Sequence, residues 1–414
     1  MINRDERQTR VLTRAKSKRD SEWAQELKNL RNREDYFPEV EYFLSLYEDN
    51  PSPKTIAERT GKPVVGILCL QAPVELFLAQ GFAPIKIYSG SQGAVSLTSP
   101  HLPALMCPAL KAVLGELQME PSFLDIPLVL PLTCDWMVKF KEARELFGDF
   151  FKESFFLQLP RCKESPRAPE RFLEELYDLS QFLEKVGGQK LKKDKLLAAI
   201  KSLEEVRWVI YELIRLRHQG KIGALYFTTI LGSFFLGPLD LFIIHLKKAL
   251  ATLKERPISN ELGKRGIFLS GSPIYFPNFK TLYLLEQAGL LVLGDDLCSS
   301  ERLLPHHVEV TDRSLSGLLL ALADSYHRAC LCPVFAENER RASLIREALE
   351  DTPIRGVVFH LLKGCHPYEL DSFSVEEKLK DWELKYLKIE TDYSAEDREN
   401  LLTRLEAFLP TLAV

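Results

Sequence analysis

Short apolar runs alternate with amphipathic segments along most of this 414-residue chain. PVVGILC at 63–69 and PLVLPLTC at 127–134 have the length of a buried strand, and the segments that follow them carry apolar residues at helical spacing. A strand that is apolar on both faces must be covered by helices on both sides, as in the parallel sheets of α/β proteins. The pattern therefore predicts a parallel sheet with strands at 63–69, 84–88, 127–134 and 154–159.

The same alternation returns after a long helical stretch at 166–220. It predicts a second sheet with strands at 265–270, 290–294, 329–334, 355–361 and 386–390. Helices are predicted at 278–289, 314–326, 337–350, 373–384 and 395–408. We therefore expect an α/β fold of two Rossmann-like, doubly wound parallel-sheet lobes. The expected units are an N-terminal helical segment at 1–60, a first lobe at 61–165, a mainly helical connecting region at 166–262 and a second lobe at 263–414.

Composition and charge exclude several classes of protein. Hydrophobic residues make up 46% and charged residues 27%, which is the balance of a globular protein and not of a disordered one. Lys and Arg number 54 against 58 Asp and Glu, so the chain lacks the basic excess of a nucleic-acid binder. Its charged first residues contain no apolar signal segment, so we expect a cytoplasmic protein.

Residues 222–239 form an uncharged stretch that needs a separate explanation. Its length approaches the ~20 residues of a membrane-spanning helix. Gly232, Gly237 and Pro238 interrupt the stretch, and Asp240 follows it directly. We therefore predict a buried strand, a loop and the start of a helix here, and no membrane segment.

Five of the eight cysteines are predicted to lie where an α/β sheet binds ligands. Ligands of open parallel sheets bind beyond the carboxyl ends of the strands. Cys107 precedes a helix predicted at 109–118, whose free amides and dipole stabilise a thiolate. The other four follow predicted strands and are Cys69, Cys134, Cys298 and Cys365.

The remaining cysteines are less informative. Cys330 and Cys332 form a CxC segment near another predicted strand, and Cys162 lies in a polar loop where no role is expected. The cysteine pattern has three interpretations: a metal or cluster site, thiols buried in the core, or a single nucleophilic cysteine. Zinc is disfavoured because no CxxC pair has a zinc-site spacing, whereas iron–sulfur clusters take all-thiolate ligation and gather ligands from distant loops. The chain also lacks a GxxxxGKS or GxxxxGKT phosphate loop, so ATP hydrolysis by that route is not expected.

Several segments in a fixed order resemble one protein family. The first half contains CLQAPVELFLAQGFAPIKIY at 69–88, LMCPALKAVLG at 105–115 and VLPLTCD at 129–135. The second half continues the series with GDDLCSSERLL at 294–304, YHRACLCPVFAENERR at 326–341, GVVFHLLKGCHPYE at 356–369 and LKIETDY at 387–393. Over residues 60–410 the chain resembles the 2-hydroxyacyl-CoA dehydratase and benzoyl-CoA reductase family.

The resemblance implies two Rossmann-like lobes around an oxygen-sensitive iron–sulfur cluster. In the dehydratases three cysteines hold one cubane, a 4Fe-4S cluster whose fourth iron is open to substrate or water. The residues that match these ligands are Cys69, Cys107 and Cys365. A separate ATP-hydrolysing iron–sulfur reductase supplies low-potential electrons in this family, which agrees with the missing phosphate loop.

Two departures from the dehydratase pattern indicate a subgroup. His366 stands where the dehydratases have an aspartate, and the chain has more cysteines than one cubane needs. This surplus resembles the double-cubane cluster proteins, in which six cysteines hold two cubanes joined by a bridging sulfide, an 8Fe-9S cluster. The further ligands that this subgroup implies are Cys134, Cys298 and Cys330, with Cys332 as a nearly equal alternative to Cys330.

The resemblance predicts the catalytic component of an ATP-dependent iron–sulfur oxidoreductase, a homodimer that reduces a small unsaturated molecule. Glu75 and His366 are the expected catalytic residues, and Asp135 is expected to help orient the ligands. One alternative is a subunit of a 2-hydroxyacyl-CoA dehydratase, with one 4Fe-4S cluster, a different partner subunit, and the CoA phosphates near Lys363 and Arg161. Another alternative is a non-catalytic electron carrier. Neither a nucleic acid nor a membrane is an expected partner.

Overall fold

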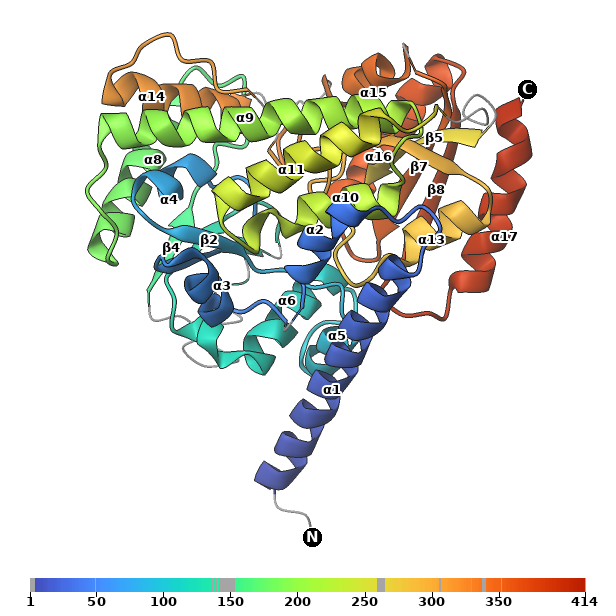
Figure 1. Cartoon of the computed structure of the whole chain (residues 1–414), viewed down its shortest axis with the longest axis horizontal. Helices are drawn as coiled ribbons and strands as arrows, with labels where there is room; N and C mark the ends of the chain where they lie inside the picture. The colour runs from blue at the N-terminus through green and yellow to red at the C-terminus, as the bar shows by residue number, and fades with distance from the viewer. Residues whose placement is uncertain are drawn as a thin grey trace.

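Two four-stranded parallel sheets form the framework of the chain in a computed structural model (Figure 1). The structure describes residues 4–48, 50–135, 137–138, 140, 153–258, 265–304, 307–328, 330–336, 340–350 and 352–413. The first sheet has the order β2-β1-β3-β4, with β1 at Val64–Ile67, β2 at Ala83–Lys86, β3 at Leu128–Pro131 and β4 at Ser154–Leu157. The second has the order β6-β5-β7-β8, with β5 at Gly266–Gly271, β6 at Leu291–Asp295, β7 at Ile354–Leu362 and β8 at Lys385–Thr391. The predicted α/β class with two Rossmann-like lobes is confirmed.

The strand order reverses beside the first strand of each sheet. β1 lies between β2 and β3, and β5 lies between β6 and β7. Ligands of open α/β sheets bind at such reversals, beyond the carboxyl ends of the strands. Cys69 and Cys134 follow β1 and β3, and Cys365 follows β7, so thiols from both lobes reach this kind of position.

Helices connect the parallel strands within each lobe. In the first lobe they are α4 at Val74–Ala79, α5 at Gln92–Thr98 and α6 at Pro108–Met119, and α3 at Pro53–Thr60 precedes β1. In the second lobe they are α13 at Lys280–Gln287, α15 at Arg340–Glu350 and α16 at His366–Asp381, and α17 at Arg398–Phe408 follows β8. α14 at Leu315–Ala323 also lies between β6 and β7 in the chain, but it packs beside the first lobe, against α8 at Ala168–Lys185 and α9 at Lys193–His218 (Figure 1). α14 continues as a π-helical turn at Asp324–Arg328, directly before the CxC segment.

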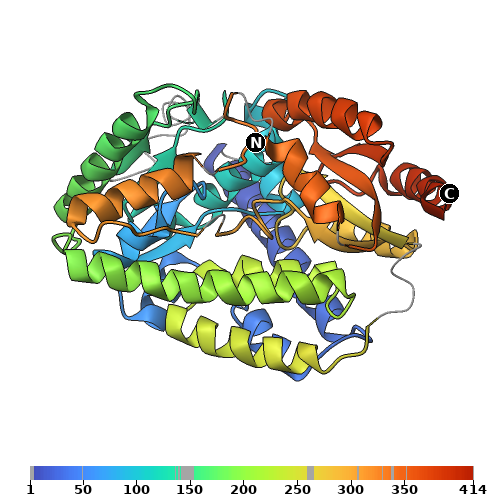
Figure 2. The same cartoon turned by 90° about the horizontal axis from the view of Figure 1, so that it is seen from above.

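A layer of four helices joins the two lobes. These helices are α8 at Ala168–Lys185, α9 at Lys193–His218, α10 at Ala224–Gly232 and α11 at Leu239–Lys254. α9 runs along both lobes and packs against α4 in the first and β6 in the second (Figure 2). One hydrophobic core extends from the first sheet through this layer into the second lobe. The helical layer therefore packs against both lobes and connects their cores.

The N-terminal helices pack on the outside of this framework. α1 at Arg4–Arg31 contacts α5 and projects away from the body of the molecule (Figure 1). A short 3-10 turn at Pro38–Val40 leads into α2 at Glu41–Ser45. An ion pair of 2.9 Å between Arg33 and Glu286 connects the segment after α1 to α13 of the second lobe.

The structure corrects three predictions of local structure. The strand predicted at 329–334 is wrong over residues 330–334, which form no strand, and Pro333 cannot donate a ladder hydrogen bond; residue 329 lies outside the described residues. The strand predicted after residue 222 is also wrong, since α10 lies there with its residues from Ala224 to Leu231 buried. A short apolar run does not distinguish a buried helix from a buried strand. α16 begins at His366 and not at 373, because Pro367 suits the first turn of a helix.

The uncharged stretch at 222–239 is divided between α10, a 3-10 turn and the first residue of α11. Within the described ranges, no helix has both the length and the apolar character that a membrane crossing requires.

Candidate functional site

Seven of the eight cysteines fall into two groups of interacting thiols. The first thiol group consists of Cys107, Cys134 and Cys365, because the pKa of Cys107 responds to both of the other sulfurs. The second thiol group consists of Cys69, Cys298, Cys330 and Cys332, because Cys298 and Cys330 act on the pKa of Cys69, and Cys330 and Cys69 act on that of Cys332. Cys162 is exposed and belongs to neither group. Each group combines cysteines from the first and the second half of the chain.

A hydrogen bond between Cys107 and Cys365 forms the centre of the first thiol group. The Cys365 thiol donates to Cys107, which lowers the pKa of Cys107 and raises that of Cys365. Cys107 lies at the N-terminus of α6, where the backbone amides of Ala109 and Leu110 lower its pKa further. The helix predicted after Cys107 is thus present, and it favours the thiolate as expected.

Gly364 allows the two sulfurs of this pair to approach. Its φ is +74°, and a Cβ at this position would lie 1.8 Å from the carbonyl oxygen of Leu105 and 3.3 Å from the amide nitrogen of Cys107. Only a glycine therefore lets the loop after β7 pass so close to the loop before α6. This close backbone approach places Cys365 beside Cys107.

Burial dominates the electrostatics of the second thiol group. Burial is the main cause that raises the pKa of Cys69 to about 12, and the nearby sulfur of Cys298 contributes to the rise. Burial likewise raises the pKa of Cys332 well above its usual value, with the nearby sulfur of Cys330 as the next cause. Cys330 is 3% exposed and accepts a hydrogen bond of 2.7 Å from the side-chain amide of Gln71. Anionic sulfurs at these positions need compensating positive charge.

Backbone amides point at a sulfur in both groups. Cys69 accepts from the amide of Gln71, and Cys332 accepts from that of Val334. In the first group, Cys365 accepts from the amide of Tyr368 and from the side chain of Ser272. Each of these bonds lowers the pKa of its thiol and favours the thiolate, which is the form that binds metal.

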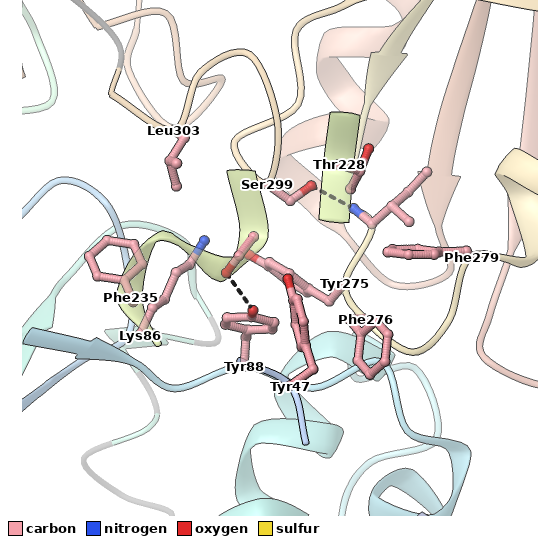
Figure 3. A pocket seen from close by; sticks show the side chains of 12 residues that line it. Tyr47, Lys86, Tyr88, Thr228, Phe235, Tyr275, Phe276, Phe279, Ser299 and Leu303 are labelled. Carbon is pink, nitrogen blue, oxygen red and sulfur yellow. Dashed lines mark hydrogen bonds between the residues drawn. The ribbon is translucent and has the colours of Figure 1, made fainter. Parts of the chain in front are cut away.

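Cationic and aromatic side chains surround the thiols. Arg302 has the sulfurs of Cys298 and Cys332 among its electrostatic neighbours and donates a hydrogen bond of 2.6 Å to the hydroxyl of Tyr368. Lys86, at the end of β2, has Cys298 and Cys69 as its neighbours. Figure 3 shows Lys86 in a pocket with Tyr88 and Tyr275. The second thiol group therefore lies in an environment of positive charge and low polarity.

The two predicted catalytic residues occupy different environments. Glu75 is fully buried and accepts from Arg207 at 2.6 Å and from the Tyr326 hydroxyl at 2.8 Å. These contacts tie α4, which follows Cys69, to α9 and to the π-helical turn before Cys330. His366 is exposed at the first position of α16, directly after Cys365.

The other polar residues considered from the sequence lie on the surface. Asp135 is exposed beside Cys134. Lys363 pairs with Asp392 at 2.8 Å, and Arg161 donates to the carbonyl oxygen of Leu132 at 3.4 Å.

Comparison with known proteins identifies the family. The family described as "2-hydroxyglutaryl-CoA dehydratase, D-component" matches residues 69–412 of the chain. The chain belongs to this dehydratase family. The family resemblance noted from the sequence is thereby confirmed.

Relatives of this dehydratase-family chain include subunits of dehydratases and of a reductase. The chain is 26% identical over 364 residues to the "Putative dehydratase subunit YjiM" of Escherichia coli (strain K12), covering 85% of this chain and 92% of the relative. It is 24% identical over 378 residues to the (R)-phenyllactyl-CoA dehydratase beta subunit of Clostridium sporogenes, covering 86% and 93%. It is 22% identical over 357 residues to a benzoyl-CoA reductase subunit of Thauera aromatica, covering 83% and 90%.

The donor set of this family member fits a cluster better than a single metal ion. Among the described residues, which include all eight cysteines, no three His, Cys, Asp or Glu side chains are placed to hold one ion together. In a cluster each iron takes its own thiolate, so the ligands need not converge on one point. Seven thiols in two groups, several of them with amide donors, meet that requirement.

Three residues of the site in this dehydratase-family chain were not predicted from the sequence. Gln71 lies two residues after Cys69, and Gly364 directly precedes Cys365. Their position beside a predicted ligand is the sequence signal that indicates a role in the site. Lys86 is a charged residue inside the otherwise apolar run PIKIY, which is unusual for a strand buried on both faces.

Proposed function

We propose that the chain is the catalytic component of an ATP-dependent iron–sulfur oxidoreductase that holds an 8Fe-9S double-cubane cluster. The observation that carries this proposal is the division of seven thiols into a group of three and a group of four. Two cubanes joined by a sulfide need three thiolates each, so Cys107, Cys134 and Cys365 would hold one. Cys69, Cys298 and either Cys330 or Cys332 would hold the other, and the Gln71 contact favours Cys330.

The residues around the thiols have separable tasks in this proposal. A bound iron–sulfur cluster supplies storage and transfer of single electrons. The amides of Gln71, Ala109, Val334 and Tyr368 donate to the sulfurs and would favour the thiolate form that binds a cluster. Glu75 positions the segments that carry Cys69 and Cys330 through its bonds to Arg207 and Tyr326.

The electrons would come from a separate ATP-hydrolysing iron–sulfur reductase. The sequence offers no GxxxxGKS or GxxxxGKT loop for ATP, so the chain depends on a partner for this energy. We propose a homodimer in the cytoplasm, where thiols remain reduced, and a small unsaturated molecule as substrate. His366, exposed beside Cys365, is the proposed proton donor to that substrate.

A second candidate function is favoured by the names of the relatives. Two of them carry the names of dehydratase subunits, and one of these is the beta subunit of (R)-phenyllactyl-CoA dehydratase. In that case the chain would hold one 4Fe-4S cluster, act on a CoA thioester and pair with a different subunit.

Metal content of the anaerobically purified protein tests the proposal. Iron and acid-labile sulfide are counted per polypeptide, and the mass of the assembly is measured by light scattering. About eight irons per chain in a homodimer supports the double cubane, and about four irons supports the dehydratase alternative. A protein that retains no iron after reconstitution contradicts both. The Cys162→Ser variant is the control and is expected to bind as much iron as the unaltered chain, because Cys162 is exposed and outside both groups.

A further inference from the structure

Lys86 is a buried cation without a carboxylate partner in the described part of the chain. It is the last residue of β2 and is 5% exposed. Its Nζ lies 4.8 Å from the ring centroid of Tyr275 and 5.7 Å from that of Tyr88 (Figure 3). The charged groups that act on it are the thiols of Cys298 and Cys69. The buried amine therefore lies near two aromatic rings, within electrostatic range of Cys298 and Cys69 of the second thiol group.

Two of the surrounding tyrosines donate their hydroxyl groups to backbone carbonyl oxygens. Tyr88 donates its hydroxyl to the carbonyl oxygen of Gly232 at 3.0 Å, and Tyr47 donates to that of Thr229 at 3.0 Å. What Tyr88 and Tyr275 present to the amine is the face of the ring, which attracts a cation weakly compared with a carboxylate. Burying an ammonium group in such a place is costly unless an anion faces it.

A thiolate-ligated iron–sulfur cluster would be that anion. Each thiolate adds a negative charge, and every accepted electron adds one more. A fixed positive charge nearby favours the reduced form and raises the reduction potential, and the effect is strong because few water molecules screen it.

We propose that Lys86 is the counter-charge of the iron–sulfur cluster held by the second thiol group, and that its ammonium group raises the reduction potential of that cluster. This inference rests on the proposed function. It assigns Lys86 a positioning and electrostatic role, without contact with substrate.

Redox titration of charge-neutral and charge-retaining variants tests the role of Lys86. Lys86→Met and Lys86→Gln remove the charge, and Lys86→Arg keeps it. Lys62→Met is the matched control, because Lys62 is exposed and lies at the opposite end of the first sheet, before β1. The midpoint potential of each anaerobic protein is measured with mediators and electron paramagnetic resonance, and iron is counted in the same samples.

The two neutral variants are expected to disfavour the reduced cluster about tenfold, which is ~59 mV to lower potential for one electron. Lys86→Arg and Lys62→Met are expected to keep the potential of the unaltered protein. Loss of iron in both neutral variants with retention in Lys86→Arg also supports the proposal, since the charge is then needed for binding.

Two results would overturn the inference. One is an unchanged potential in iron-replete Lys86→Met, and the other is a Lys86→Arg variant that behaves like Lys86→Met, because shape and not charge would then matter. Either result leaves the proposed function in place if the unaltered chain binds iron. An unaltered chain without iron removes the proposed function itself.

Discussion

The side-chain amide of Gln71 donates a hydrogen bond of 2.7 Å to the sulfur of Cys330. Gln71 belongs to the loop between β1 and α4, and Cys330 follows the π-helical turn of the second half of the chain. The Glu75 to Tyr326 hydrogen bond of 2.8 Å joins the same two segments a few residues further along. Two side-chain contacts thus bring the CxC segment to the end of β1, where Cys69 lies.

This relationship predicts that Cys330 is the ligand of the CxC pair. The Cys330→Ser variant is expected to lose about half of the iron, because one of two cubanes would lack a thiolate. Cys332→Ser is expected to keep most of its iron. Iron and sulfide counts on anaerobic samples measure both effects. The reverse order of losses would assign the role to Cys332, and equal retention in both variants would remove the pair from the ligand set.

Gly364→Ala is expected to separate the sulfurs of Cys107 and Cys365. A Cβ at residue 364 meets the carbonyl oxygen of Leu105 at 1.8 Å, so the two loops must move apart. Gly61→Ala is the matched control, because Gly61 has a φ of +64° but nothing within 4 Å of its added Cβ. Both variants should lose about 1–2 kcal/mol of unfolding free energy from the left-handed backbone. Only Gly364→Ala should also lose iron, and equal iron content in the two variants would contradict the proposed placement of Cys365.

The buried ion pair between Glu75 and Arg207 is expected to be essential for stability. Glu75→Gln leaves the Arg207 guanidinium buried without its closest counter-charge, which costs about 3–5 kcal/mol of unfolding free energy. Glu204→Gln removes the other carboxylate on Arg207, but this group is 25% exposed, so the expected loss is about 0–1 kcal/mol. Urea denaturation of both variants measures the difference. A stable Glu75→Gln protein without turnover would instead support the catalytic role expected from the sequence.

His360 is expected to make stability fall in mild acid. Burial lowers its pKa from 6.5 to about 4, and its Nδ1 lies 2.8 Å from the carbonyl oxygen of Ser272. His360 is therefore protonated below about pH 6.5 in the unfolded chain, whereas in the folded chain it stays neutral until the pH is near 4. The stability from this group is complete above pH 6.5 and declines by about 3 kcal/mol as the pH falls to 4.

Urea denaturation across that range measures the slope for the unaltered protein and for His360→Asn. The slope should be smaller in the variant, and His101→Asn, which changes an exposed histidine, should keep the original slope. Identical slopes in the unaltered protein and His360→Asn would show that this histidine does not govern the acid response.

Local sequence patterns were sufficient to predict the two sheets. The runs at 63–69 and 355–361 became β1 and β7 because apolar, β-branched strands between helices have few alternatives. The position of Cys107 before α6 was also predictable from a local signal, because Pro108 occupies the first helical position. The patterns failed at the CxC segment and at α10, where an apolar run alone does not specify a strand or a helix.

The sequence by itself determined that thiols would follow the strands of two parallel sheets, because strand position and loop position are local properties of the chain. Only the tertiary structure decided which thiols meet. Cys107 and Cys365 are neighbours because the backbones at Leu105 and Gly364 pass each other closely, and Cys330 reaches Cys69 through Gln71. The isolation of Lys86 from any carboxylate among the described residues also depends on how the lobes and helices pack around it. Such contacts arise between segments far apart in the chain, and no periodicity or local spacing encodes them.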